Sequence, residues 1–208
     1  MEDTLSVKKA IKLLRAAAKS GKQFYLGVGM HKPHMPWQFA PEDLDKHPLE
    51  SVDAPTHRLP ATNVPEIALT YTDSHADGGA HTSPFAPISV SSTKLARRAY
   101  RAALTGMDRK LGRLYDEIEN LGLASTTAVV VHSDHGWHLG EHGLWRKFTN
   151  FEAVARVPLI IKAPWIEGAP ARSDALVELV DVMPTILELA GFELPEGETL
   201  DGDRKSVV

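Results

Sequence analysis

The chain has 208 residues, enough for one domain with a substantial hydrophobic core or for a large part of a bigger domain. Its 23 basic and 27 acidic residues give a net charge of −4 without any basic block, so we expect no nucleic-acid partner. No apolar run is long enough to span a membrane, so we expect no membrane partner, and the lack of cysteine excludes disulfides, zinc–thiolate sites and a cysteine nucleophile within these residues.

The first elements in chain order are a helix and a buried strand. Apolar residues recur with a 3.6-residue period over 6–20, with Ser6 as a plausible cap and Gly21 as a plausible end. The sequence QFYLGVGM at 23–30 then predicts a buried strand. This strand must end at HKPHMP, because the two prolines of that sequence cannot continue it.

Residues 35–92 follow no clear period and hold most of the chain's prolines. A compact domain rarely contains so long a stretch without a purpose, so we predict a lid or substrate-binding loop. Aromatic residues spread along the stretch favour this interpretation over a plain connection.

The remaining elements are two helices and two strands. The pattern predicts a long amphipathic helix at 93–121, apolar strands at 126–133 and 157–162, and a helix at 176–190. The strands are apolar on both faces, as in a sheet covered by helices on both sides. We therefore predict one α/β domain over 1–208, with a mainly parallel sheet flanked by helices.

Two predicted strands end in polar clusters, HKPH at the first and SDHG at the second. The carboxyl ends of parallel strands meet at one edge of a sheet, where ligands usually bind. Asp134 and His135 in the second cluster suit a divalent cation, and Gly136 lets the backbone turn behind them. The alternative is that Asp134 only caps a turn and that His135 is an exposed surface residue.

A second metal hypothesis uses four histidines whose spacing is similar to that of a zinc site: His132, His135, His138 and His142. We favour it less, because His132 lies within the predicted strand and should point away from the others.

Several cationic or imidazole side chains are expected near the same edge: His31, Lys32, His34, Arg146 and Lys147. A cation together with such side chains would suit a tetrahedral oxyanion, either phosphate or sulfate. Taken singly, each Lys or Arg could equally be a solvated surface charge, and the flanking Trp137 and Trp145 could be packing residues. No complete nucleophile motif accompanies them.

The sequences FYLGVGMHKPHMPW and HSDHGWHLGEHGLWRKFTNFEAVARVPLII together resemble the sulfatase family, and within it the iduronate-2-sulfatase-like branch. The resemblance extends over about residues 1–200 and rests on H-K-P-H-x-P combined with S-D-H-G-x-x-L-G-E-H-G-x-W-x-K.

The resemblance implies an alkaline-phosphatase-like α/β fold, a calcium ion and hydrolysis of sulfate esters, here on sulfated sugars such as glycosaminoglycans. It implies a formylglycine nucleophile, made from the first residue of C-x-P-x-R or S-x-P-x-R, and a parent protein that is exported or lysosomal. At matching positions, Asp134 and His135 would be metal ligands. His34 and Lys147 would contact the ester, and one of them would protonate the departing alcohol. We expect substrate contacts from His31, Lys32, Trp137 and Arg146, and a scaffold role for Glu141, His142 and Trp145.

The chain departs from the family pattern because it contains no cysteine and no serine that begins S-x-P-x-R. We therefore expect it to be a C-terminal portion of a sulfatase catalytic domain that is inactive by itself. The alternatives are a non-catalytic domain that binds sulfate or phosphate ligands through His34, Arg146 and Lys147, and a phosphoric ester hydrolase of the same superfamily.

Overall fold

The computed structural model describes residues 2–69, 83–168 and 172–202. By its internal contacts the chain divides into two units. Unit 1 comprises Met1–Leu121 and His135–Arg156, and unit 2 comprises Gly122–Asp134 and Val157–Val208. Among the described residues no helix is both long enough and apolar enough to cross a membrane.

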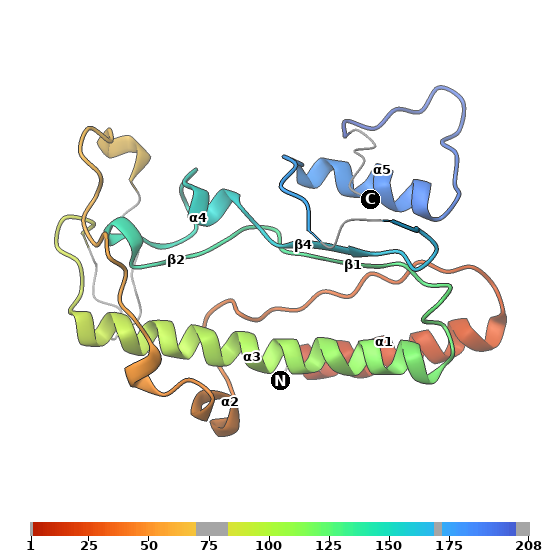
Figure 1. Cartoon of the computed structure of the whole chain (residues 1–208), viewed down its shortest axis with the longest axis horizontal. Helices are drawn as coiled ribbons and strands as arrows, with labels where there is room; N and C mark the ends of the chain where they lie inside the picture. Colours follow the sequence, from red (N-terminus) through yellow and green to blue (C-terminus); the bar gives the residue numbers. More distant parts are fainter. Residues whose placement is uncertain (1, 70–82, 169–171, 203–208) are drawn as a thin grey trace. The chain divides into compact units, whose positions relative to one another are not determined.

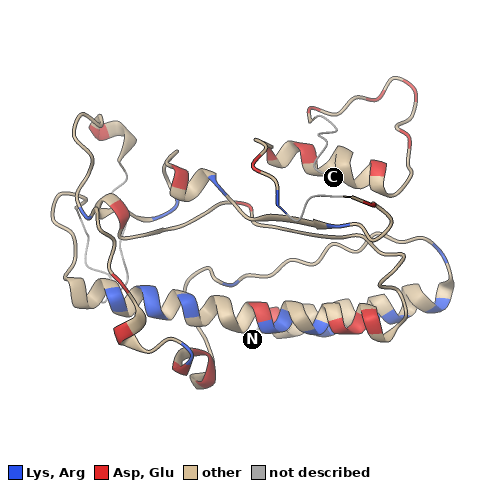
Figure 2. Cartoon of the chain, in the orientation of Figure 1, with Lys and Arg blue, Asp and Glu red and all other residues tan. Residues whose placement is uncertain are grey.

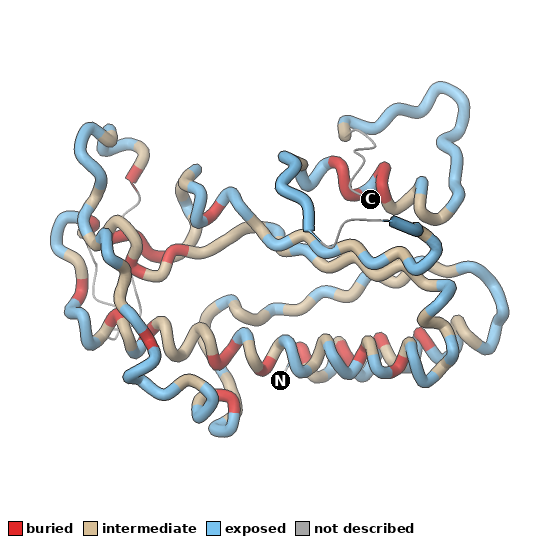
Figure 3. The backbone as a smooth tube through the Cα atoms, viewed as in Figure 1, coloured by how far each residue is buried: buried red, intermediate tan, exposed pale blue. Residues whose placement is uncertain are grey.

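Unit 1 is built on two long helices that pack side by side, α1 (Glu2–Ser20) and α3 (Val90–Asn120) (Figure 1). Val7 and Ala10 of α1 form a buried cluster with Leu114 of α3, and Figure 3 shows buried positions recurring along both helices. Both helices begin earlier than predicted. The start of α1 is four residues before the predicted cap Ser6, which lies inside the helix.

The glycine stops of these helices follow the prediction, whereas the caps do not. Ser89 accepts a hydrogen bond from the Ser92 backbone N–H and so caps α3, which therefore starts three residues before the predicted position. Gly21 and Gly122 have φ values of 63° and 68° directly after the two helices. This left-handed conformation is the usual stop signal, and glycine adopts it without strain.

Residues 23–30 were predicted to form a buried strand, and this is wrong in two respects. No strand partner is assigned to them among the described residues, and only alternate side chains are sheltered. Leu26, Val28 and Met30 pack against the α1–α3 cluster, while Tyr25 is 74% exposed. The segment has the alternating burial of an extended chain, with every second side chain sheltered. The hydrophobicity of the segment could not show whether a neighbouring strand would pair with it.

The described part of 35–92 is not structureless. It contains α2 (Pro41–Asp45) and two 3-10 turns, η1 (Leu49–Ser51) and η2 (Glu66–Ala68). The first half of α3 carries only basic charged residues (Figure 2), and these hold the loop in place. The Arg98 Nε donates to the His47 carbonyl at 2.6 Å, and an Arg101 nitrogen donates to the Ser51 carbonyl at 3.3 Å. The part of the predicted loop at 70–82 lies outside the described residues.

The rest of unit 1 is a short hairpin that carries the predicted site. Strands β2 (His138–Leu139) and β3 (Trp145–Arg146) pair antiparallel around the turn η3 (Glu141–Gly143), and the short helix α4 (Glu152–Ala155) follows. Trp145 is 2% exposed and packs with Ile88 and Ala96. A second core cluster therefore lies beneath the hairpin.

Unit 2 holds β1 (Val129–His132), β4 (Leu159–Lys162), the turn η4 (Leu179–Asp181) and helix α5 (Val182–Leu189). The strands β1 and β4 pair antiparallel, so both pairings in the described residues contradict the predicted parallel arrangement. Apolar runs fit either strand direction, which is why the pattern could not decide it. The prediction that both faces are covered is also wrong for the described residues, because Ile160 of β4 is 59% exposed.

Candidate active site

The HKPH loop is held from beneath by a carboxylate of α1. Asp3 is 5% exposed, and its two oxygens accept the backbone N–H of His31 at 2.6 Å and that of Lys32 at 3.3 Å. The Lys32 ammonium donates to the carbonyls of His34 and Pro36, at 3.3 and 3.0 Å. Lys32 therefore holds its own loop together with two of its three N–H donors, and its predicted contact with substrate stays a prediction.

His34 is fixed in one tautomer. Its Nδ1 lies 2.7 Å from the Met35 carbonyl oxygen, and since a carbonyl can only accept, Nδ1 carries the hydrogen. In the neutral ring the lone pair is then on Nε2. His31 lies beside His34 with ring centroids 4.9 Å apart, and the edge of Trp137 meets His34 at 5.6 Å and 72°.

The turn after β1 is set by a close backbone approach. The N–H groups of Gly136 and Trp137 donate to the carbonyls of Val154 and Ala153, at 2.7 and 2.9 Å. A Cβ at Gly136 would collide with the Ala153 carbonyl oxygen, so only glycine fits. The sequence had predicted a glycine-dependent turn, but the requirement comes from this approach and not from a left-handed φ.

His135 and Lys147 form the closest polar contact between predicted site residues. The Lys147 ammonium donates to His135 Nε2 at 2.7 Å, while His135 Nδ1 lies 2.8 Å from the Gly136 carbonyl oxygen. Trp137 stacks on His135 at 6.2 Å and 29°. His31, His34, Trp137, His135 and Lys147 are thus joined by contacts in one continuous series within unit 1.

The remaining predicted residues are Arg146, Asp134 and His132. Arg146 lies in β3 opposite His138, and its φ is 65°. Asp134 belongs to unit 2, where the Ser133 hydroxyl lies 3.5 Å from its Oδ1. His132, also in unit 2, is exposed.

The comparisons with known proteins agree with the quoted motifs. The family model described as Sulfatase matches residues 1–192. The chain belongs to the sulfatase family. It is 32% identical to iduronate 2-sulfatase from Homo sapiens over 224 residues, an alignment that covers 94% of this chain and 41% of that protein. The chain thus spans about two-fifths of the length of this sulfatase.

Two solved structures show the same fold. One is described as a complex with its substrate D-glucosamine-2-N,6-O-disulfate; it superposes with a TM-score of 0.74 and 23% identity over 94% of this chain and 49% of that one. The other is a phosphonate monoester hydrolase from Silicibacter pomeroyi, with a TM-score of 0.73 and 24% identity over 97% of this chain and 40% of that one. The predicted alkaline-phosphatase/sulfatase-like α/β fold is therefore confirmed.

The metal ion that the sulfatase family implies does not fit the donors present here as a complete site. In the parts of the chain that the structure describes, no group of three or more His, Asp or Glu residues is arranged to hold a metal ion. Calcium takes six to eight oxygen ligands. This chain offers the Asp134 carboxylate and the His135 ring, whose Nε2 already accepts from Lys147. The zinc hypothesis also fails here, because His138 is fully buried with its Nε2 2.8 Å from the Thr149 hydroxyl.

The residues predicted as scaffold belong to the hairpin, with Glu141 and His142 in η3 and Trp145 in β3. Glu141 accepts from the Arg97 guanidinium and from the Leu139 backbone N–H, each at 2.6 Å. Burial alone would raise the pKa of Glu141, but these hydrogen bonds outweigh it and the pKa is lowered. Burial lowers the pKa of His138. The sulfatase hairpin is therefore held by an ionised carboxylate and a neutral imidazole.

Sequence reasoning missed Asp3 and Arg97, which position the two halves of the site. Asp3 lies before the first predicted helix, and Arg97 lies within the helix predicted at 93–121 without any assigned role. Neither carries a local signal of its role, since each acts on a segment at least 28 positions away.

Proposed function

We propose that this chain supplies the ester-binding side of a sulfatase active site, which hydrolyses sulfate esters of sugars. The observation that carries the proposal is the contact series from His34 through Trp137 and His135 to the Lys147 ammonium, in a member of the sulfatase family. His34 and Lys147 contact the ester, and His31, Trp137 and Arg146 line the substrate side.

The chemistry of this series suits the departure of an alcohol. A sulfate ester is a tetrahedral anion, and cationic hydrogen-bond donors stabilise the charge that develops on its oxygens. Cleavage of the ester leaves an alkoxide, which needs a proton. Lys147 carries such a proton next to His135, and His34 can carry one on Nε2, so one of these two residues protonates the leaving oxygen.

These 208 residues provide neither the formylglycine nor a full set of calcium ligands, so the proposal takes both from other residues. When bound, they would supply charge neutralisation and the attacking oxygen. Asp134 would contribute one carboxylate ligand, and His135 would have to exchange its contact with Lys147 to contribute a second ligand. The isolated chain should accordingly bind calcium weakly, and Asp134→Asn should remove what binding there is in a calcium titration.

The proposed substrates are sulfated carbohydrates. Support comes from the names of the related proteins, an iduronate 2-sulfatase and a structure described with a disulfated glucosamine as substrate. The segment 35–92 is the proposed substrate loop, because α3 holds its described part against the same unit as the site.

A sulfate titration of the chain, followed by calorimetry, tests the proposal. Lys147→Ala should weaken sulfate binding by about tenfold or more, since a charge-assisted hydrogen bond is lost. Lys22→Ala, a change of equal charge at an exposed position, should leave the affinity unchanged. Equal affinities for the two variants would contradict the proposal. Phosphate in competition with sulfate would show whether the site prefers the sulfuric or the phosphoric ester.

A further inference from the structure

Unit 1 contains a groove that is lined by residues 56–61 and His142. Its volume is about 620 Å³, within the range of roughly 300–1,000 Å³ typical of small-molecule sites. The polar side chains of its lining are Thr56, His57, Arg58 and His142, and no acidic residue is among them. We call it the His57 groove.

The two imidazole rings of the groove, those of His57 and His142, lie nearly parallel and are joined by a backbone hydrogen bond. The His142 backbone N–H donates to the His57 carbonyl at 2.7 Å, and the two rings are nearly parallel, 7° apart, with centroids separated by 6.2 Å. His142 Nδ1 is buried and has no hydrogen-bond partner among the described residues. A buried polar atom normally has a partner, so this nitrogen is suited to meet a ligand or a water molecule.

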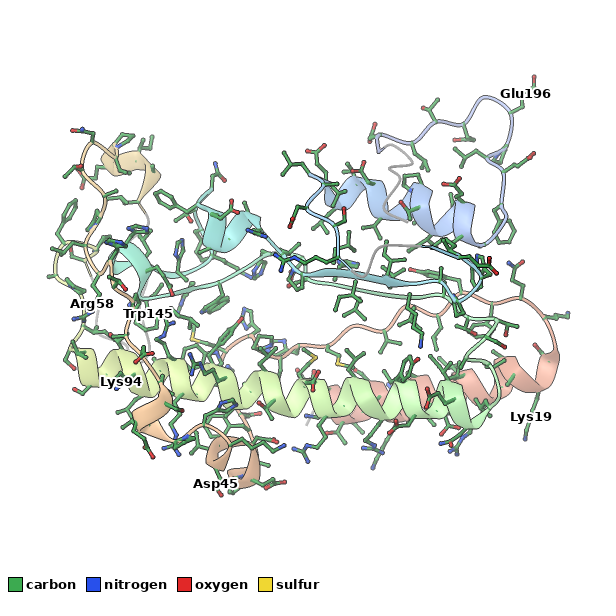
Figure 4. All side chains as sticks on the ribbon, in the orientation of Figure 1. Lys19, Asp45, Arg58, Lys94, Trp145 and Glu196 are labelled. Carbon is green, nitrogen blue, oxygen red and sulfur yellow. The ribbon has the colours of Figure 1, made fainter. Side chains whose placement is uncertain are left out.

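Arg58 adds a guanidinium at the same place. One terminal nitrogen of its guanidinium donates to the carbonyl of Ile88, a residue of the core cluster beneath the hairpin. Figure 4 shows Arg58 and Trp145 in the same region. A guanidinium has five N–H donors, so a single carbonyl contact fixes its position without exhausting its capacity. A planar fork of this kind suits the paired oxygens of a sulfate or a carboxylate.

Contacts connect the groove to the proposed ester site. The His142 ring lies 6.1 Å from Phe151, whose edge meets His138 at 6.0 Å, and His138 bonds Thr149. The Thr149 N–H in turn donates to the Lys147 carbonyl at 2.9 Å. His142 and Lys147 are five residues apart, so their Cα atoms are separated by at most about 17 Å. Neighbouring groups on one sugar chain could occupy both places.

We propose that the His57 groove binds a second oxyanion, sulfate or carboxylate, on a sugar next to the one whose ester contacts Lys147. The inference rests on the proposed function and deepens it, because it makes the substrate a multiply charged saccharide chain.

Calorimetry on the 208-residue chain tests this with a heparin-derived tetrasaccharide, the same tetrasaccharide without its sulfates, and inorganic sulfate. Arg58→Gln should weaken tetrasaccharide binding roughly tenfold and leave unchanged the part of the inorganic sulfate binding that Lys147→Ala removes. Arg113→Gln, an equal charge change at an exposed position of α3, is the control. His57→Gln serves as a second groove variant, because it leaves the Arg58–Ile88 contact in place.

The outcomes separate the two proposals. If Arg58→Gln and His57→Gln bind the tetrasaccharide as Arg113→Gln does, the groove proposal is overturned while the Lys147 site stands. If Lys147→Ala leaves sulfate binding unchanged but the groove variants still weaken tetrasaccharide binding, the proposed function fails and the groove stands as an anion site. An Arg58 effect that persists with the desulfated tetrasaccharide identifies the bound group as a carboxylate, and one that disappears identifies it as a sulfate.

Discussion

A single carboxylate, Asp3, holds the loop that carries His34. It is almost fully buried, and each of its oxygens accepts one of two consecutive backbone N–H groups. Asp3→Ala would leave both N–H groups without their acceptor, so we expect a loss of about 1–3 kcal/mol in the free energy of unfolding. Because the loop also loses its anchor, sulfate affinity should fall as well.

Glu2→Ala is the control for this prediction, because Glu2 lies in the same first helical turn but is exposed. It reports the helix-dipole contribution of a carboxylate by itself, roughly 0.3–1 kcal/mol. Urea unfolding and a sulfate titration check both variants. An Asp3→Ala chain that binds sulfate as the unchanged chain does would show that Asp3 stabilises α1 without positioning His34.

His138 makes stability depend on pH. Burial lowers its pKa from the ordinary value of 6.5, so the unfolded chain takes up a proton near that pH while the folded chain does not. The stabilisation is therefore present above about pH 6.5 and is lost as pH falls, by up to roughly 1.4 kcal/mol per pH unit for one group. Thermal unfolding between pH 7.5 and 5 should show this decline.

The same scan on His138→Gln isolates the effect, because glutamine can still bond Thr149 but does not titrate. Its unfolding temperature should change less over this range. Glu141, whose pKa is lowered from 4.5, adds a loss only at lower pH, as its carboxylate becomes protonated. A parallel decline in both chains above pH 5 would assign the effect to other groups.

At the residue scale, the sequence predicted which side chains lie close together. It did not predict the hydrogen-bond partner of each side chain. His34, Trp137, His135 and Lys147 were expected near one another, and the contacts join them. Lys32 was expected to face a ligand, yet its ammonium closes its own loop. Motif spacing constrains which residues approach one another, whereas the partner of a flexible cation depends on carbonyls that no pattern reveals. The catalytic and metal roles of these residues stay predictions.

At the scale of elements, the basic half of α3 joins the described part of 35–92 to the hairpin. Arg97 pairs with Glu141 at 2.6 Å, with side chains 18% and 33% exposed. Glu141→Ala removes this pair and the bond to the Leu139 N–H, so we expect a loss of about 1–3 kcal/mol. Glu152→Ala is the control, because its pair with Arg156 is largely exposed and should contribute less than about 1 kcal/mol.

Urea unfolding monitored by tryptophan fluorescence is suited to this comparison, since Trp145 packs beneath the hairpin. Equal losses for the two glutamate variants would mean that the Arg97–Glu141 pair is only a surface contact and that the hairpin is held by the Trp145 cluster. A larger loss for Glu141→Ala would assign the anchoring of β2 and β3 to α3.

The presence of the helices and their glycine stops followed from the sequence because helical period and glycine stops are local properties, whereas the starts of the helices differed from the prediction by three to six residues. Strand direction did not, because an apolar run has the same pattern in a parallel and in an antiparallel pair. The predicted parallel sheet and the buried strand at 23–30 both depended on neighbours that a local pattern cannot specify. Elements joined by backbone pairing were therefore the least predictable part of the fold.

At the scale of the whole molecule, the decisive question is whether these 208 residues can turn over a sulfate ester by themselves. They hold no cysteine and no serine that begins S-x-P-x-R, so the attacking group of the proposed mechanism is not among them. The expected result is that 4-nitrophenyl sulfate incubated with the purified chain releases 4-nitrophenol no faster than in buffer. The Lys147→Ala chain should give the same rate. Repeated turnover that is lost in Lys147→Ala would mean that the nucleophile lies within these residues, and the formylglycine-based proposal would be wrong.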